Sequence, residues 1–189
     1  QAQAIGAVIA DHTADLIPAD RLLYELRDVT ATVPSLPLIA SSVLSKKLAG
    51  GADAIVLDVK CGDGAFMREE AAARRLAETL VRVGNKLGKK FSALITAMDE
   101  PLGTRAGNAL EVVQAIEVLR GEGPADLREV TVALGAELLV LAGQVASPAV
   151  GRERLAGLIS SGQAWALFRK LVAAQGGDVR AIEEPRRLP

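Results

Sequence analysis

This sequence is poor in aromatic residues, in cysteine and in excess charge of either sign. Aromatic residues make up 3% of the 189 residues while half of the chain is apolar, so a core must be built from Leu, Val, Ile and Ala. That composition favours helices packed against a parallel sheet over an all-β sandwich. The length is enough for one ordinary domain with a substantial core.

The balance of charge excludes some classes of partner. With 22 Lys and Arg against 23 Asp and Glu, the formal net charge is −1, which gives neither a basic footprint for nucleic acid nor an acidic tail. The most apolar late stretch, residues 130–142, contains Glu137 and is too short to span a bilayer. We therefore expect a globular protein without a nucleic-acid or membrane partner.

Cysteine usage and the first residues bear on the compartment. The one cysteine, Cys61, cannot form an intramolecular disulfide, so nothing indicates an oxidising compartment. The opening Gln-Ala-Gln-Ala lacks the basic region and apolar run of a signal peptide. A cytoplasmic location is the expectation. Because the chain has no initiator methionine and opens into an apolar run, we interpret it as the central portion of a longer protein.

Hydrophobic periodicity predicts an α/β layer followed by helices. Three short apolar runs, residues 4–10, 53–59 and 91–96, are typical of buried strands, and a long amphipathic pattern separates the last two. This β-α-β spacing predicts parallel strands joined by a right-handed crossover. Helices are expected over residues 19–26, 36–49, 69–87, 109–119, 127–142, 152–160 and 164–174.

Arg27, Ser42 and Lys46 are the candidate binding residues. Ser42 and Lys46 are four residues apart on one expected helix and so share a face, while Arg27 ends the helix before it. Together they would offer two fixed positive charges and a hydroxyl to a planar, electron-rich ligand. Considered without any family, however, such residues are more often a solvated polar face with small packing residues, and the residues alone favour that interpretation.

The stretch that contains these donors, LRDVTATVPSLPLIASSVLSKKLAGGADAIVLDVKCGDGAFM, closely resembles the pyrimidine-binding segment of the thymidine and pyrimidine-nucleoside phosphorylases. The later stretches MDEPLG, GNALEV and EGPADLR are also similar to that family. The resemblance implies an α/β fold of the nucleoside phosphorylase and phosphoribosyltransferase type. Residues 1–13 would be a strand of the α/β domain, residues 14–49 part of a small helical domain for base binding and dimerisation, and residues 50–189 the central portion of the α/β domain.

The resemblance also implies an activity. In this family inorganic phosphate attacks the anomeric carbon of thymidine, and of uridine or deoxyuridine in some members, and the pyrimidine leaves with growing negative charge. Arg27, Ser42 and Lys46 fall on the family's base-binding arginine, serine and lysine, which would stabilise that charge. The resemblance further implies a pentosyltransferase of nucleoside salvage that acts as a homodimer on a pyrimidine nucleoside and phosphate.

No catalytic residue is identified in this chain. The family's active-site histidine belongs to a Lys-His-Ser-Thr-Gly-Gly phosphate segment, which is absent from these residues, and His12 stands in a different context, Asp11-His12-Thr13. We therefore expect the isolated chain to be inactive in phosphorolysis. The sequence assigns no role to His12, nor to Asp63, which stands where relatives have a small residue.

The resemblance implies no cofactor besides phosphate as co-substrate. Some relatives bind a monovalent or calcium ion through backbone carbonyls, which fall on Leu102 and Arg105 here, and through an acidic side chain, which falls on Gln114. Gln114 brings no charge and Arg105 adds repulsion. No metal ligand is therefore assigned.

Two alternatives stay open. A phosphoribosyltransferase of related fold, such as an anthranilate-transferring enzyme, would need an acidic, magnesium-binding loop, and no such pattern stands out. A non-catalytic dimerisation fragment would need no ligand at all. Binding of a pyrimidine separates both from the phosphorylase interpretation.

Overall fold

The computed structural model describes residues 2–10, 16–184 and 188. The chain divides into two compact units. The first, called here the helical unit, comprises Gln1–Ala10, Pro101–Ala136 and Val145–Pro189. The second, called the sheet unit, comprises Asp11–Glu100 and Glu137–Gln144.

The sheet unit is built on two parallel strands. Strand β1 (Ala54–Cys61) pairs in register with β2 (Lys90–Ala97), and helix α4 (Glu70–Lys86) connects them. Alternate residues of β1, namely Ile55, Leu57 and Val59, are buried on one face of the sheet, as the period of two requires. The predicted β-α-β unit with parallel strands is confirmed.

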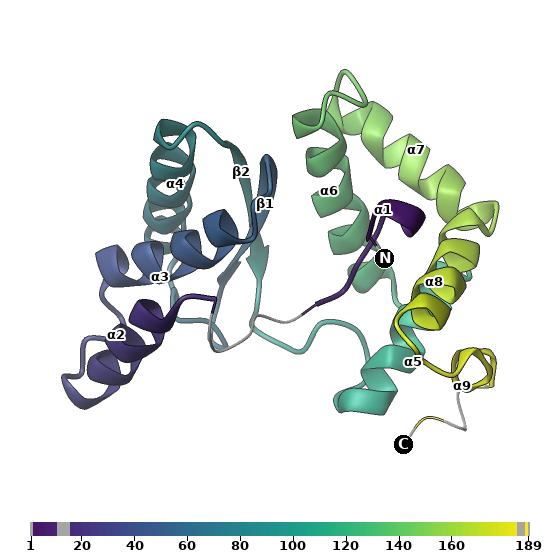
Figure 1. The fold of residues 1–189 in the computed structure, drawn as a ribbon, viewed down its shortest axis with the longest axis horizontal. Helices are drawn as coiled ribbons and strands as arrows, with labels where there is room; N and C mark the ends of the chain where they lie inside the picture. The colour runs from purple at the N-terminus through teal and green to yellow at the C-terminus, as the bar shows by residue number, and fades with distance from the viewer. Residues whose placement is uncertain (1, 11–15, 185–187, 189) are drawn as a thin grey trace. The chain divides into compact units, whose positions relative to one another are not determined.

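Helices α3 (Leu36–Ala49) and α4 contribute to the same core as the buried side of this sheet (Figure 1). Helix α2 (Pro18–Val29) packs in turn against α3. Gly84 allows α4 to approach β2 closely, because a Cβ there would lie 2.3 Å from the ring of Phe91. The core has the aliphatic character that the composition predicted, and its buried members are Ala40, Leu44, Ile55, Leu57, Val59, Met67, Ala73, Leu76, Ala77, Leu80 and Phe91.

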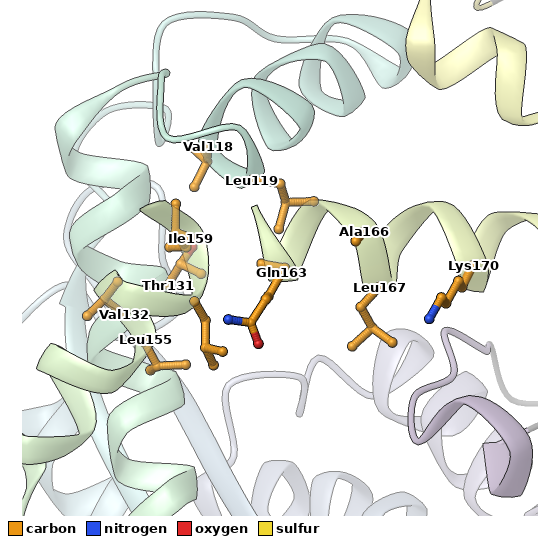
Figure 2. A pocket seen from close by; sticks show the side chains of 12 residues that line it. Val118, Leu119, Thr131, Val132, Leu155, Ile159, Gln163, Ala166, Leu167 and Lys170 are labelled. Carbon is orange, nitrogen blue, oxygen red and sulfur yellow. The ribbon is translucent and has the colours of Figure 1, made fainter. Parts of the chain in front are cut away.

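The helical unit contains the remaining helices. These are α5 (Asn108–Leu119), α6 (Ala125–Leu141, whose end belongs to the sheet unit), α7 (Pro148–Ser160), α8 (Gln163–Ala174) and α9 (Val179–Glu183). An apolar cavity of about 550 Å³ lies among α5, α6, α7 and α8. Gln163, Leu167 and Lys170 project into it from one side of α8 (Figure 2). The predicted helices of this region are confirmed, with ends that shift by a few residues.

The strand predicted over residues 4–10 is wrong. Residues Ala2–Ile5 form a short helix, α1, and Gly6–Ala10 have no regular structure. The helical unit has no strand among its described residues that could supply a ladder. Instead the side-chain amide of Gln175 accepts from the N–H of Ile9 at 3.3 Å and donates to its carbonyl at 2.6 Å. One side chain thus takes the place of a neighbouring strand.

Other expectations from the sequence concern His12, the domain assignment and the membrane. His12 lies outside the described residues. The assignment of residues 14–49 to a separate small helical domain stays a prediction. Among the helices that the structure describes, none has the length and apolar character needed to cross a bilayer.

Candidate functional site

Helices α2 and α3 bring the three predicted donors together. Helix α2 begins at Pro18, whose fixed φ suits a first turn, and carries Arg27 in its last turn. Helix α3 begins after Ser35 and carries Ser42 and Lys46 one turn apart. Because α2 packs against α3, the two halves of the predicted site belong to one helical pair.

A carboxylate that sequence reasoning missed, Asp20, joins these donors. Its Oδ2 accepts a hydrogen bond from Lys46 Nζ at 2.5 Å and one from Ser42 Oγ at 3.1 Å. Lys46 Nζ also donates to Ser42 Oγ at 2.8 Å, which closes a triangle of bonds. Asp20 stands seven residues before Arg27 on α2, and this helical spacing is the signal that could have revealed it.

We call Asp20, Arg27, Ser42 and Lys46 the donor cluster. Its net charge differs from the expectation. Burial of Asp20 opposes its ionisation, but hydrogen bonds from Lys46 and Ser42 and the charges of Lys46 and Arg27 outweigh it, so the pKa of Asp20 lies below its usual value. Asp20 is therefore ionised at neutral pH. The cluster carries one net positive charge, where the sequence suggested two.

Arg27 is buried and is not part of a solvated face. Its Nη2 donates to the carbonyl of Val33, and its guanidinium lies 5.1 Å from the centre of the Tyr24 ring. In the described structure its buried Nε has no hydrogen-bond partner. Ser42 is buried as well, with 8% of its surface exposed. The interpretation of the cations as a solvated helix surface is therefore wrong for Arg27, whereas the burial of Ser42 agrees with its interpretation as a small packing residue.

A small apolar cavity of about 160 Å³ adjoins α3. Ile39 and Val43, which flank Ser42 on the helix, line one side of it, and Phe66 lines another. Phe66 is 73% exposed, which is unusual for an aromatic side chain. The sheet unit thus offers an apolar wall near polar donors, the combination that small-molecule sites commonly use.

The carboxyl ends of β1 and β2 hold other polar residues that the sequence drew attention to. Asp58 and Lys60 form an ion pair at 2.6 Å, and Lys60 Nζ also donates to Thr96 Oγ1. The backbone N–H of Asp63 donates to Asp99 Oδ1 at 3.1 Å. Cys61 Sγ lies 3.6 Å from the carbonyl of Arg68. Asp58, Lys60 and Asp63 are thus held in contacts within the sheet unit.

The parallel β-α-β unit with its packed helices is a mixed α/β fold, and the family that the sequence matches has the nucleoside phosphorylase and phosphoribosyltransferase fold. The chain belongs to the family described as "Glycosyl transferase family, a/b domain", which it matches over residues 2–165. The fold class and the family resemblance predicted from the sequence are therefore confirmed, and the family is one of transferases.

Curated relatives are pyrimidine-nucleoside phosphorylases. The chain is 49% identical over 181 residues to the pyrimidine-nucleoside phosphorylase of Geobacillus stearothermophilus. It is 48% identical to that of Bacillus subtilis and 49% identical to that of Staphylococcus aureus, again over 181 residues. Each alignment covers 96% of this chain and 42% of the relative. The chain therefore spans less than half the length of these relatives.

Proposed function

We propose that this chain supplies the base-binding part of a pyrimidine-nucleoside phosphorylase, in which Arg27, Ser42 and Lys46 hold the pyrimidine. The observation that carries the proposal is the donor cluster itself. Two cations and a hydroxyl are gathered on α2 and α3, where the carboxylate of Asp20 orients Lys46 and Ser42 and the carbonyl of Val33 holds Arg27. The family membership and the names of the curated relatives support it.

The charge of the donor cluster suits the reaction. In phosphorolysis an oxygen of inorganic phosphate bonds to C1′ of the nucleoside while the bond from C1′ to the base nitrogen breaks, and its electron pair stays on the base. The base then takes up a proton, which the phosphate gives up on forming the ester, so the products are the free base and ribose or deoxyribose 1-phosphate, and the reverse reaction restores the nucleoside. One net positive charge in the cluster matches the one negative charge that the departing base develops, so it favours the transition state over the neutral ground state.

Each member has a distinct part in this proposal. Lys46, whose side chain is 32% exposed, retains access to a ligand while Asp20 and Ser42 fix its position. Arg27 brings a second donor group, whose buried Nε lacks a partner in the described structure. The apolar wall of Ile39, Val43 and Phe66 would face a less polar edge of the base.

The same proposal extends to the assembly and setting of the protein. We expect a homodimer in the cytoplasm that serves nucleoside salvage, with phosphate as the co-substrate and no other cofactor. The phosphate-binding residues are not among those assigned in this chain. Sedimentation of the chain at several concentrations tests the dimer, independently of ligand binding.

Calorimetric titration of the chain with thymidine, uridine and deoxyuridine tests the proposal, with adenosine as the control ligand. We expect saturable binding of the pyrimidine nucleosides and no comparable binding of adenosine. A folded chain that binds none of them would contradict the proposal, and if that chain still sediments as a stable dimer, the result would favour the non-catalytic dimerisation fragment. Magnesium-dependent binding of a phosphoribosyl diphosphate in place of nucleosides would favour the phosphoribosyltransferase.

A further inference from the structure

The segment that leads into α5 is fixed by a buried amide. Gln114 on α5 is 1% exposed, and its Nε2 donates to Thr104 Oγ1 at 2.8 Å. Gly103 adopts a left-handed conformation with φ +79°, and a Cβ at this position would lie 2.6 Å from Gln114 Oε1. The amide therefore packs directly onto the backbone of the segment. We call Gly103, Thr104, Arg105 and Gln114 the amide cluster.

Two acidic side chains complete the attachment of this segment. Arg105 Nη2 forms an ion pair with Glu117 at 3.0 Å, and Glu117 lies three residues after Gln114 on the same helix. Asp126, in the first turn of α6, accepts a hydrogen bond from the N–H of Gly103 at 2.7 Å. The segment is thus tied to α5 through two side chains and to α6 through a third.

The residues present do not fit a cation at this place. Monovalent and calcium ions are held by oxygen ligands, and carboxylates supply most of the compensating charge. Here the side chain at the acidic position is a neutral amide that already bonds Thr104, while the guanidinium of Arg105 brings a positive charge to the same short segment. The carboxylate of Glu117 is engaged by Arg105 and that of Asp126 by the N–H of Gly103, so neither is left to offset the charge of a cation.

We propose that the amide cluster replaces the cation that some relatives bind, so that this chain holds the segment over residues 101–107 without a metal ion. The hydrogen-bonded amide of Gln114 holds the segment in this chain, as an ion with a carboxylate ligand would hold it in those relatives. The ion pair with Glu117 compensates the positive charge of Arg105. The inference concerns how the helical unit is held together, and it does not depend on the proposed activity.

Thermal unfolding of the chain in chelator-treated, tetramethylammonium buffer tests this inference, with KCl or CaCl₂ added in a titration. For the natural chain we expect Tm to show no saturable dependence on either ion beyond that of ionic strength. For Gln114→Glu we expect a lower Tm without the ion and a saturable rise of about 2–4 °C with it. Gln3→Glu, which adds the same charge at an exposed position of α1, is the matched control and should show no such rise.

Two results would overturn the inference. One is a natural chain that binds potassium or calcium stoichiometrically in a calorimetric titration and loses that binding in Gln114→Ala. The other is a folded Gln114→Glu chain whose Tm responds to the ions no more than the Gln3→Glu control. If Gln114→Glu fails to fold, the double variant with Arg105→Ala removes the opposing charge and is titrated in its place, while the calorimetry of the natural chain decides by itself.

Discussion

The donor cluster of the sheet unit and the amide cluster of the helical unit are both polar groups in largely buried surroundings, yet they are satisfied differently. In the amide cluster, Gln114 is 1% exposed and the charge of Arg105 is paired with the neighbouring Glu117. In the donor cluster, one positive charge remains uncompensated and the Lys46 side chain is 32% exposed. A closed network of paired groups suits structural support, whereas a surplus of oriented donors with access to solvent suits ligand binding.

The two clusters also differ in whether they require a glycine. The amide cluster depends on Gly103, where the backbone conformation and the lack of a Cβ are both required by Gln114. The donor cluster contains no glycine, and its geometry comes from side chains that two packed helices project toward one another. We therefore expect substitutions in the amide cluster to lower the stability of the chain and substitutions in the donor cluster to weaken ligand binding.

The largest expected effect is on ligand binding by the donor cluster. Replacing Lys46→Ala removes a charged donor, and hydrogen bonds to charged groups contribute enough that nucleoside affinity should fall about 10- to 100-fold. Lys47→Ala is the matched control, because Lys47 is the next residue on the same helix and is exposed. Calorimetric titration of both variants with thymidine gives the comparison, and equal affinities for the two would remove Lys46 from the site.

The amide cluster is broken most cleanly at Gly103. Gly103 and Gly88 share a φ of +79°, but a Cβ at Gly88 would meet nothing within 4 Å, whereas at Gly103 it would meet the Gln114 amide. Both alanine variants pay the cost of the left-handed conformation, so their difference isolates the contact. We expect Gly103→Ala to lower the free energy of unfolding by about 1–2 kcal/mol more than Gly88→Ala, as overpacking does in a buried site. Urea denaturation measures the free energy of unfolding of both variants. Equal losses would show that the segment shifts to accommodate the added Cβ at no extra cost.

Much of the fold could be predicted because local chemistry determines it. Pro18 and Gly50 mark a helix start and a helix end where the structure has them, and the alternation of Ile55, Leu57 and Val59 marks a strand. The run over residues 4–10 misled because an apolar stretch predicts a buried strand, whereas Val8 and Ile9 are 53% and 67% exposed and the described residues of the same unit include no strand to pair with them. Gln175, which bonds Ile9 instead, lies 166 residues further along the chain.

Three of the four residues of the donor cluster were predicted from the sequence, whereas Asp20 and the net charge of the cluster were not. Arg27, Ser42 and Lys46 were found through a family motif, whereas Asp20 acts through bonds to residues 22 and 26 positions away. Such a contact depends on how α2 packs on α3, and one sequence does not reveal that packing. The helical spacing from Asp20 to Arg27 can be seen in the sequence, but it indicates a shared site only once α2 and α3 are known to pack together.

The smallest expected effect concerns the contribution of Asp20 to stability. Hydrogen bonds from Lys46 and Ser42 keep the Asp20 pKa below its unfolded value although burial acts in the opposite direction, so its ionised form is bound more tightly in the folded state. This contribution is present at neutral pH, above the unfolded pKa, and is lost as the pH falls through the folded pKa. Because Lys46 remains a third exposed, Asp20→Asn should cost only about 1 kcal/mol at pH 7.

The pH dependence of unfolding separates this electrostatic contribution from mere packing. The free energy of unfolding of the natural chain should fall on acidification, and the curve of Asp20→Asn should approach it at low pH, because a protonated Asp20 and an asparagine are alike in charge and size. Asp28→Asn, at an exposed position of the same helix, should leave the slope nearly unchanged. Curves for Asp20→Asn and the natural chain that stay parallel from pH 7 to the acid limb would mean that Asp20 holds Ser42 and Lys46 by shape and not by charge. The single net positive charge assigned to the donor cluster would then have to be revised, because that value depends on an ionised Asp20.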